Sequence, residues 1–134
     1  MKLNFFLFSI SFFFIISCSV TDTDSTKNKL VGQWEWIRST GGIIGETTTR
    51  DSAGVPNRRF NFNFSQTFSF YRADTLVQTG IFSLNKKDGD LVISYNTKEE
   101  NFFFDQRVNF QGKDTLILAD ECYDCYINTY IRTQ

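Results

Sequence analysis

An alternation of apolar and polar side chains with a period of two residues most limits what this chain can fold into. In residues 58–64, and again in residues 67–71, phenylalanine takes every second position and mostly polar residues fill the positions between. Neighbouring side chains of a β-strand point to opposite faces of the sheet. The spacing therefore predicts strands that each have one buried face and one face in water.

Short segments of this kind continue along the chain, and turn residues such as Asp88-Gly89 and Gly112 separate them. Eight strands are expected, at residues 30–38, 58–64, 67–71, 76–84, 91–95, 102–110, 115–119 and 125–132. Residues 39–56 read as one long irregular segment with four glycines and the only proline. No convincing amphipathic helix is present. The sequence predicts an all-β fold: an eight-stranded antiparallel up-and-down barrel whose first and last strands meet.

The N-terminus carries an apolar segment of another kind. After Lys2, only two serines interrupt the apolar run of residues 5–16, which has about the length of a signal-peptide core and is too short to span a bilayer. Residues 15–18, Ile-Ile-Ser-Cys, resemble the lipobox of bacterial lipoprotein signals, in which cleavage precedes a lipidated cysteine. We expect residues 1–17 to be a signal peptide and Cys18 to be lipidated. The alternative is an ordinary secretory signal next to an unrelated cysteine.

The following residues, 18–29, are small and polar and show no apolar period, so we expect the lipidated cysteine and a flexible tether there. The barrel domain would then occupy residues 30–134. This organisation predicts a protein held at the outer membrane or cell surface of a Gram-negative bacterium, with the lipid bilayer as its partner through acylated Cys18. Stable attachment needs more than one acyl chain, which a lipoprotein cysteine provides.

The whole predicted domain resembles the lipocalin and fatty-acid-binding superfamily, in particular the small lipocalin-like lipoproteins of Bacteroidetes-type bacteria. The resemblance depends on Gly32-x-Trp34 followed by Trp36, on the glycine-rich residues 41–45, and on the closing residues 116–124 and 130–132. Cys125 stands where the pattern leads us to expect glycine. The likeness implies a barrel that holds a small molecule, with its first loop over the open mouth. In residues 39–56, that role would fall to Ile43 and Ile44 as a lid, and a flexible surface loop is the alternative.

The first and last strands contain residues suited to close such a barrel. Glycine at position 32 lets the first strand bend, and Trp34 can then plug the closed end. We expect the guanidinium of Arg132 to lie on the indole of Trp34, an arrangement that contributes roughly 0.5–2 kcal/mol. The alternative is a core tryptophan with a frayed terminal arginine.

Cys122 and Cys125 are the one pair of residues with reactive potential. With Cys18 lipidated, they form an even pair in an oxidising compartment, which favours a disulfide. A redox role needs a lowered thiol pKa, whereas the neighbours here, Asp120, Glu121 and Asp124, are acidic and favour the thiol form. We therefore expect a structural staple or a free pair, with redox chemistry as the alternative.

Several classes of function are disfavoured by composition. The chain has no histidine, no Walker loop and no dinucleotide fingerprint, so we expect no enzyme, no catalytic residue, no cofactor and no metal site. Without Lys2 the 14 basic residues become 13 against 15 acidic ones, which gives no reason to expect nucleic-acid binding.

The leading functional hypothesis is a binding module for a small apolar molecule. Eight strands enclose room for either side chains or one small ligand. Inward phenylalanines are the candidates that would line the ligand: Phe60, Phe62, Phe64, Phe68, Phe70, Phe82, Phe102, Phe104 and Phe110. The same side chains can instead fill the interior, and the alternative is a filled barrel with a structural or interaction role. An enzyme using Cys122 and Cys125 is the third hypothesis.

Overall fold

One helix and nine strands make up the part of the chain that the computed structural model describes, residues 22–98 and 103–133. The elements are α1 (Asp22–Leu30), β1 (Gly32–Gly41), β2 (Glu46–Thr49), β3 (Arg58–Phe62), β4 (Thr67–Arg72), β5 (Thr75–Lys87), β6 (Asp90–Thr97), β7 (Gln106–Gln111), β8 (Thr115–Asp120) and β9 (Tyr126–Arg132). The predictions for the signal peptide, for Cys18 and for Phe102 lie outside the described residues.

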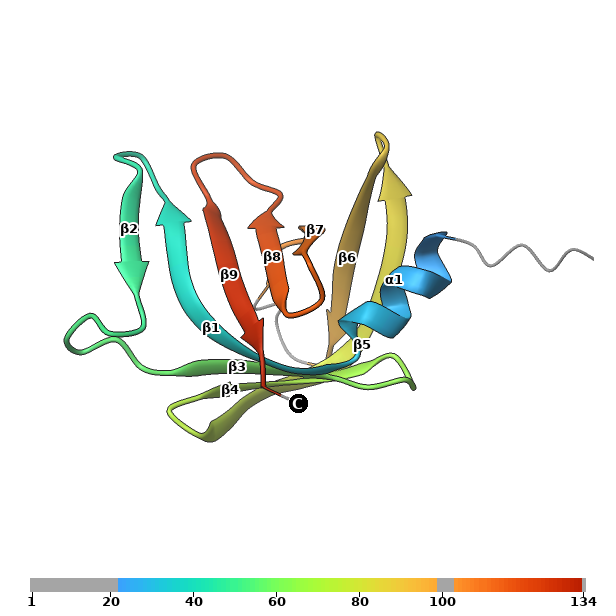
Figure 1. Cartoon of the computed structure of the whole chain (residues 1–134), viewed down its shortest axis with the longest axis horizontal. Helices are drawn as coiled ribbons and strands as arrows, with labels where there is room; N and C mark the ends of the chain where they lie inside the picture. The colour runs from blue at the N-terminus through green and yellow to red at the C-terminus, as the bar shows by residue number, and fades with distance from the viewer. Residues whose placement is uncertain (1–21, 99–102, 134) are drawn as a thin grey trace, which may run out of the picture.

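The strands form one antiparallel sheet that closes on itself (Figure 1). From β3 to β9 each strand pairs with the next along the chain, and β1 closes the ring by pairing with both β3 and β9. At the closure, Trp34 lies opposite Phe60 on one side and opposite Arg132 on the other. The predicted eight-stranded antiparallel up-and-down barrel is confirmed, and β2 is an additional strand outside the ring.

β1 has two different neighbours along one of its sides. Its residues 32–35 pair with β3, whereas residues 38–41 pair with β2. Between β1 and β2 the chain turns at Gly42 and Gly45, whose φ angles of 74° and 65° suit glycine. The Gly45 N–H donates to the Gly42 carbonyl at 3.0 Å. The prediction of one irregular segment over residues 39–56 is therefore wrong for its first half, because these glycines form a hairpin turn between two strands.

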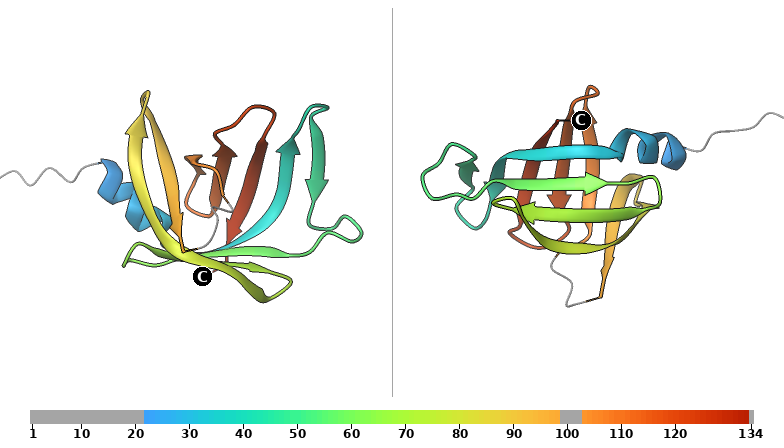
Figure 2. Two further views of the ribbon diagram at one scale, coloured as in Figure 1. Left: turned by 180° about the vertical axis from the view of Figure 1, so that it is seen from behind. Right: turned by 90° about the horizontal axis from the view of Figure 1, so that it is seen from below.

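The predicted flexible tether is also corrected, because α1 occupies most of it. α1 lies beside β5 and the start of β1 (Figures 1 and 2). Its last residue, Leu30, is completely buried, whereas the rest of its described side chains are partly or fully exposed. The residues carry no apolar period that would favour a helix, so contacts with the barrel must stabilise it.

Those contacts come from Trp34 and Arg132, which bind the carbonyl groups at the end of α1. The Trp34 Nε1–H donates to the Leu30 carbonyl at 2.7 Å. The Arg132 guanidinium donates to the carbonyls of Val31, at 2.8 Å, and of Lys29. Arg132 Cζ also lies 4.2 Å from the centre of the Trp34 ring, so the predicted stack is confirmed. The last carbonyls of a helix have no partner within the helix, and these two side chains supply one.

Aromatic rings fill a large part of the barrel interior. The Phe60 ring lies at the centre, with ring centroids between 4.8 and 6.2 Å from those of Phe62, Phe68, Phe70, Tyr95, Phe103 and Tyr130. Trp34, Trp36, Phe82, Leu116 and Leu118 complete this core and are almost completely buried. We call the rings around Phe60 the ring cluster.

The contact between β6 and β7 is the shortest pairing in the ring. Only Val92 with Arg107 and Ile93 with Gln106 are paired along it. Side chains reinforce this seam. Glu121, after β8, accepts hydrogen bonds at 2.6 Å from both Lys87 at the end of β5 and Arg107 on β7. Arg107 also pairs with Asp90 on β6 at 3.6 Å.

We expect the Glu121 ion pairs to make the stability of the barrel depend on pH. Hydrogen bonds from Lys87 and Arg107 lower the pKa of the Glu121 carboxyl. Its contribution is therefore present above the ordinary glutamate pKa of about 4.3 and is lost as the pH falls through the lowered value. In urea titrations, Glu121→Gln should be less stable than wild type at pH 7, and the difference should be smaller at pH 3. An equal difference at both pH values would contradict this.

Candidate functional site

A cavity of about 400 Å³ lies beside the ring cluster and reaches the surface at the exposed side chains of Phe104 and Tyr126. Its apolar lining comes from Phe70, Val77, Phe103, Phe104 and the Tyr130 ring, and its polar lining from Ser39, Thr48, Arg58, Arg72, Gln106, Asp120, Tyr126 and Asn128. These residues belong to eight strands and to the segment before β7. The cavity is therefore a property of the closed barrel rather than of one loop.

Polar residues reach the cavity because the inward face of several strands changes character along its length. On β3 the inward row runs from Phe62 and Phe60 to Arg58, and on β4 from Phe68 and Phe70 to Arg72. The other rows end in the same way, at Asp120 on β8, at Gln106 on β7 and at Asn128 on β9. The interior is thus apolar around the ring cluster and polar toward the cavity.

Two short hydrogen-bond chains fix this polar lining. The Trp36 Nε1–H donates to the Ser39 hydroxyl at 2.8 Å, and that hydroxyl donates to Asn128 Oδ1 at 2.6 Å. On the other wall, the Tyr95 hydroxyl donates to Gln106 Oε1 at 2.7 Å. Satisfied buried networks of this kind hold side chains in one orientation.

The second chain continues from Gln106 to the carboxylate of Asp120. The Gln106 Nε2–H donates to Asp120 Oδ1 at 2.5 Å. Burial raises the pKa of the Asp120 carboxyl, although hydrogen bonds from Gln106 and from the Tyr126 N–H oppose the shift. Burial also raises the pKa of the Tyr95 hydroxyl well above its usual value, so Tyr95 is a neutral donor. Gln106 Oε1 and Asp120 Oδ1 therefore both accept hydrogen bonds from within the protein.

Arg58 and Arg72 bring positive charge into the same cavity. They are paired residues of β3 and β4, directly opposite each other. Arg58 Cζ lies 4.6 Å from the centre of the Trp36 ring, and Arg58 Nε is buried without a hydrogen-bond partner. The sequence reasoning missed both residues as site candidates. The alternation itself could have found them, because Arg58 shares the face of Phe60 and Arg72 that of Phe70.

The structure divides the predicted ligand-lining phenylalanines into different groups. Phe70 and Phe104 line the cavity. Phe60, Phe62, Phe68 and Phe82 are buried in the core and do not line it. Phe110 is partly buried against the core and lies 6.0 Å from the Trp34 ring centroid, so its predicted place in the cavity is wrong as well. Phe103, which the alternation did not select, lines the cavity.

Phe64 is the clearest error among these predictions, because its side chain is 69% exposed. β3 ends at Phe62, and the Asn63 N–H donates to the Thr67 carbonyl to form the turn into β4. The alternation thus runs two residues beyond the strand. Phe104 is also mostly exposed, at 58%, and it lies at the mouth of the cavity rather than inside the barrel.

The predicted lid does not cover the cavity. Ile43 and Ile44 lie in the β1–β2 turn, where they are 88% and 84% exposed, and neither lines the cavity. The positive φ angles of the flanking glycines hold this turn as a compact hairpin tip. The resemblance to a first loop folded over a barrel mouth therefore does not hold at these residues.

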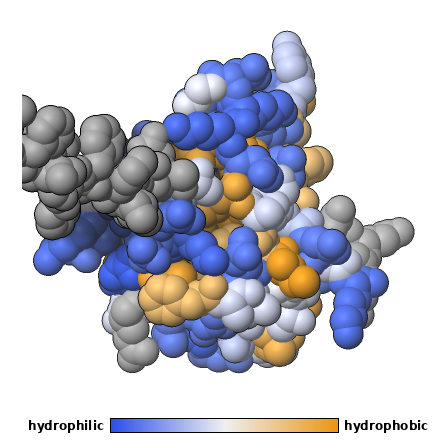
Figure 3. Space-filling model, turned by 90° about the vertical axis from the view of Figure 1, so that its right-hand side faces the viewer, coloured by the Kyte–Doolittle hydropathy of each residue, from blue (hydrophilic) through white to orange (hydrophobic). Residues whose placement is uncertain are grey.

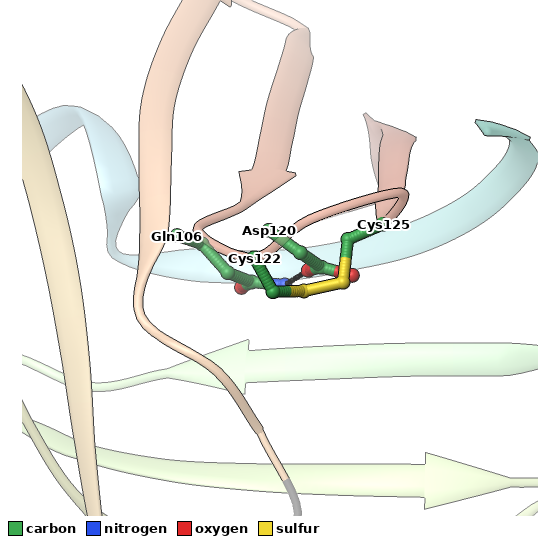
Figure 4. The surroundings of a disulfide bond; sticks show 4 residues. All are labelled: Gln106, Asp120, Cys122 and Cys125. Carbon is green, nitrogen blue, oxygen red and sulfur yellow. Dashed lines mark hydrogen bonds between the residues drawn. A yellow bond between two sulfur atoms is a disulfide. The ribbon is translucent and has the colours of Figure 1, made fainter. Parts of the chain in front are cut away.

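Cys122 and Cys125 are joined by a disulfide in the loop between β8 and β9, which is the staple of the two expected states, a structural staple or a free pair. Figure 4 shows the bond beside the side chains of Gln106 and Asp120. The Cys125 carbonyl accepts a hydrogen bond from the Gly42 N–H at 3.4 Å, which ties this loop to the β1–β2 turn. The staple therefore fixes the loop that follows Asp120.

The outer surface offers a weaker candidate for a site. On the face that carries α1, apolar side chains form small groups separated by hydrophilic ones, apart from the area hidden by the residues drawn in grey (Figure 3). Scattered apolar side chains are normal on protein surfaces. The interior cavity is therefore the candidate functional site.

Neither a metal site, nor a membrane-spanning helix, nor a known relative was found for the described residues. Within residues 22–98 and 103–133, no cluster of three or more His, Cys, Asp or Glu side chains could hold a metal ion. In the same residues, no helix has the length and apolar character needed to cross a membrane. Comparison with protein-family models, with curated proteins and with solved structures found no match to this chain.

Proposed function

We propose that this chain is a lipid-anchored, lipocalin-like binding protein of the bacterial cell envelope whose barrel takes up one small molecule with an apolar part. The observation that supports binding most directly is the cavity of about 400 Å³ with its two hydrogen-bonded walls. Small-molecule sites span roughly 300–1,000 Å³ and combine apolar lining with a few fixed polar groups. This cavity has both properties.

The proposed anchor is supported by the sequence. The apolar run of residues 5–16 is followed by Ile-Ile-Ser-Cys, and a lipidated Cys18 would join the barrel to the outer membrane or cell surface of a Gram-negative bacterium. α1 begins four residues after this cysteine. The lipid would therefore attach close to a segment that is docked on the barrel, and the tether would be short.

We expect Cys18→Ser to move the protein from the membrane fraction to the soluble fraction. The substitution removes the thiol that would carry the acyl chains, and a domain without them has no strong membrane affinity. Detergent phase partitioning of envelopes from cells that express either form measures the change. Cys122→Ser with Cys125→Ser is the matched control, because it removes cysteines without touching the proposed anchor. Membrane retention of Cys18→Ser would contradict the anchor.

We expect Thr48→Trp to block the cavity and abolish ligand binding. Thr48 lies opposite Ser39 and lines the cavity, so an indole at this position would occupy its volume. Native mass spectrometry of the protein extracted in mild detergent should show a bound small molecule on wild type and none on Thr48→Trp. Thr47→Trp is the control, because Thr47 is exposed and lies on the other face of the same strand.

A filled barrel with a structural or interaction role is the second candidate, and the ring cluster is the observation that favours it. Phe60, Phe62 and Phe68 occupy interior space that a larger ligand would need. If wild type carries no molecule and takes up no probe, the filled barrel is the better description. Uptake that Thr48→Trp removes and Thr47→Trp retains would exclude it.

A further inference from the structure

We propose that the molecule bound in the cavity carries an anionic group, such as a carboxylate, sulfonate or phosphate, and that Arg58 and Arg72 bind this group while the apolar body lies on Phe70 and Phe103. The inference rests on the proposed binding function and names the chemistry of its ligand. Three features of the described residues support it: the charge of the wall, one unpartnered donor atom and the position of the acidic group.

The first feature is a pair of like charges placed face to face. Arg58 and Arg72 are directly opposite in the β3–β4 register, and both line the cavity. Like charges at such positions destabilise a sheet. Among the described residues, neither arginine forms a salt bridge. An anion between the two guanidinium groups would replace their repulsion by attraction.

Arg59, the neighbour of Arg58, is an arginine of the same strand that does not line the cavity. It points to the outer face, where its Nη1 lies 3.5 Å from Asp74 Oδ1 and its Cζ lies 4.8 Å from the centre of the Tyr71 ring. Arg58 and Arg59, adjacent on one strand, therefore differ in whether an acidic side chain of the protein pairs with them. The outer one has an acidic partner, and the inner one faces a cavity.

The second feature is the unpartnered donor of Arg58. Its Nε is buried and makes no hydrogen bond, while the flat face of the guanidinium rests on Trp36. Leaving a buried donor unsatisfied costs about 1–3 kcal/mol, and more for a charged group. Stacking on Trp36 fixes the plane of the guanidinium, and Arg58 is among the residues that line the cavity. A planar guanidinium with free donors is well suited to bind carboxylate, sulfonate or phosphate oxygens.

The third feature is that the acidic group of the cavity is already engaged. Asp120 is the one acidic residue among the described residues that line it. Its carboxylate accepts hydrogen bonds from the Gln106 side chain and, at the backbone, from Tyr126. It belongs to the wall formed by β7 and β8, whereas the arginines belong to β3 and β4. Asp120 is therefore not the partner of Arg58, and that place remains for a ligand.

Two fluorescent probes that differ by one anionic group test the inference. 1-Anilinonaphthalene-8-sulfonate carries a sulfonate, and N-phenyl-1-naphthylamine has the same rings without it. Wild type should bind the sulfonate at least about tenfold more tightly, the factor expected for a charge-assisted hydrogen bond in a shielded site. Thr48→Trp should weaken both probes, which shows that the fluorescence reports on the cavity.

The arginine variants identify which residues bind the anionic group of the probe. Arg58→Met should weaken binding of the sulfonate probe at least about tenfold and leave the neutral probe nearly unchanged, because methionine retains contact with Trp36 without the charge. Arg72→Met should have a smaller effect, since Arg72 is more exposed. Arg59→Met is the matched control and should change neither probe. Arg58→Gln serves as a second variant if Arg58→Met does not fold.

The results distinguish the charge from the cavity itself. If wild type binds both probes equally, or if Arg58→Met and Arg58→Gln affect both probes to the same extent, the anionic inference is overturned and the binding function stands. If wild type binds neither probe, the proposed function fails and the inference fails with it. Competition by 2-naphthoate and 2-naphthyl phosphate, with 2-naphthol as the neutral reference, then shows which anion the pair of arginines prefers.

Discussion

Phe60→Ala is expected to lower the free energy of unfolding by about 3–5 kcal/mol, the usual cost of removing a buried phenyl ring. Phe60 is completely buried and stands at the centre of the ring cluster, in contact with aromatic side chains from three other strands and from the segment before β7. The surrounding rings come from a closed barrel, so they can collapse only partly into the space that the substitution leaves. Urea titration followed by tryptophan fluorescence measures the change.

Phe64→Ala is the matched control for this experiment. Phe64 continues the same alternation four residues later, but its side chain is mostly in water. Its replacement should change the free energy of unfolding by no more than about 0.5 kcal/mol. Equal losses at the two positions would mean that β3 extends to Phe64 and that the turn described here is wrong.

Trp34→Ala is expected to cost a similar amount, about 3–5 kcal/mol, and also to release α1 from the barrel. The indole is completely buried, supports the Arg132 guanidinium on its face and donates to the Leu30 carbonyl. Amide hydrogen exchange should therefore show protection lost in α1 beyond the loss in the strands. Trp34→Phe retains a ring without the donor and should lose less stability than Trp34→Ala.

A double-mutant cycle with Arg132→Leu isolates the stack between the two side chains. We expect a coupling free energy of roughly 0.5–2 kcal/mol between Trp34→Phe or Trp34→Ala and Arg132→Leu. Strictly additive losses would show that the guanidinium acts only through its hydrogen bonds to the carbonyls of Lys29, Val31 and Lys113. The contact between the Arg132 guanidinium and the Trp34 ring would then contribute nothing to the free energy of unfolding.

The sequence predicted the barrel well because the alternation directly records which side chains a strand buries. β3, β4, β8 and β9 follow it within a few residues, and the closure between Trp34 and Arg132 follows from the need to seal a ring of strands. The predictions were wrong where a turn or an irregular segment interrupted the strand, so that every second residue no longer pointed inward. The turn at Asn63 ended β3 before Phe64, and the irregular approach to β7 placed Phe103, not Phe104, against the core.

Tertiary contacts account for what the sequence pattern could not show. α1 has no apolar period, and a single buried leucine together with bonds from two barrel side chains holds its end. The polar lining of the cavity was missed for another reason. In the sequence, Gln106, Asp120 and Asn128 resemble polar residues on the solvent-exposed face of a strand. Only the closed barrel shows that they line the cavity. Arg58 was visible in principle, because an arginine in register with Phe60 must point inward.

The short strand β2 has a consequence for how copies of this protein meet one another. It stands at the end of the strand order, so one of its sides offers unpaired backbone groups, and that side belongs to only four residues, Glu46–Thr49. A strand that is short, charged at one end and rich in threonine is a poor template for another chain. Gly45 separates it from Ile43 and Ile44, which would otherwise lengthen the edge with apolar residues. That glycine thus keeps the unpaired edge short, which disfavours edge-to-edge pairing between copies of this barrel.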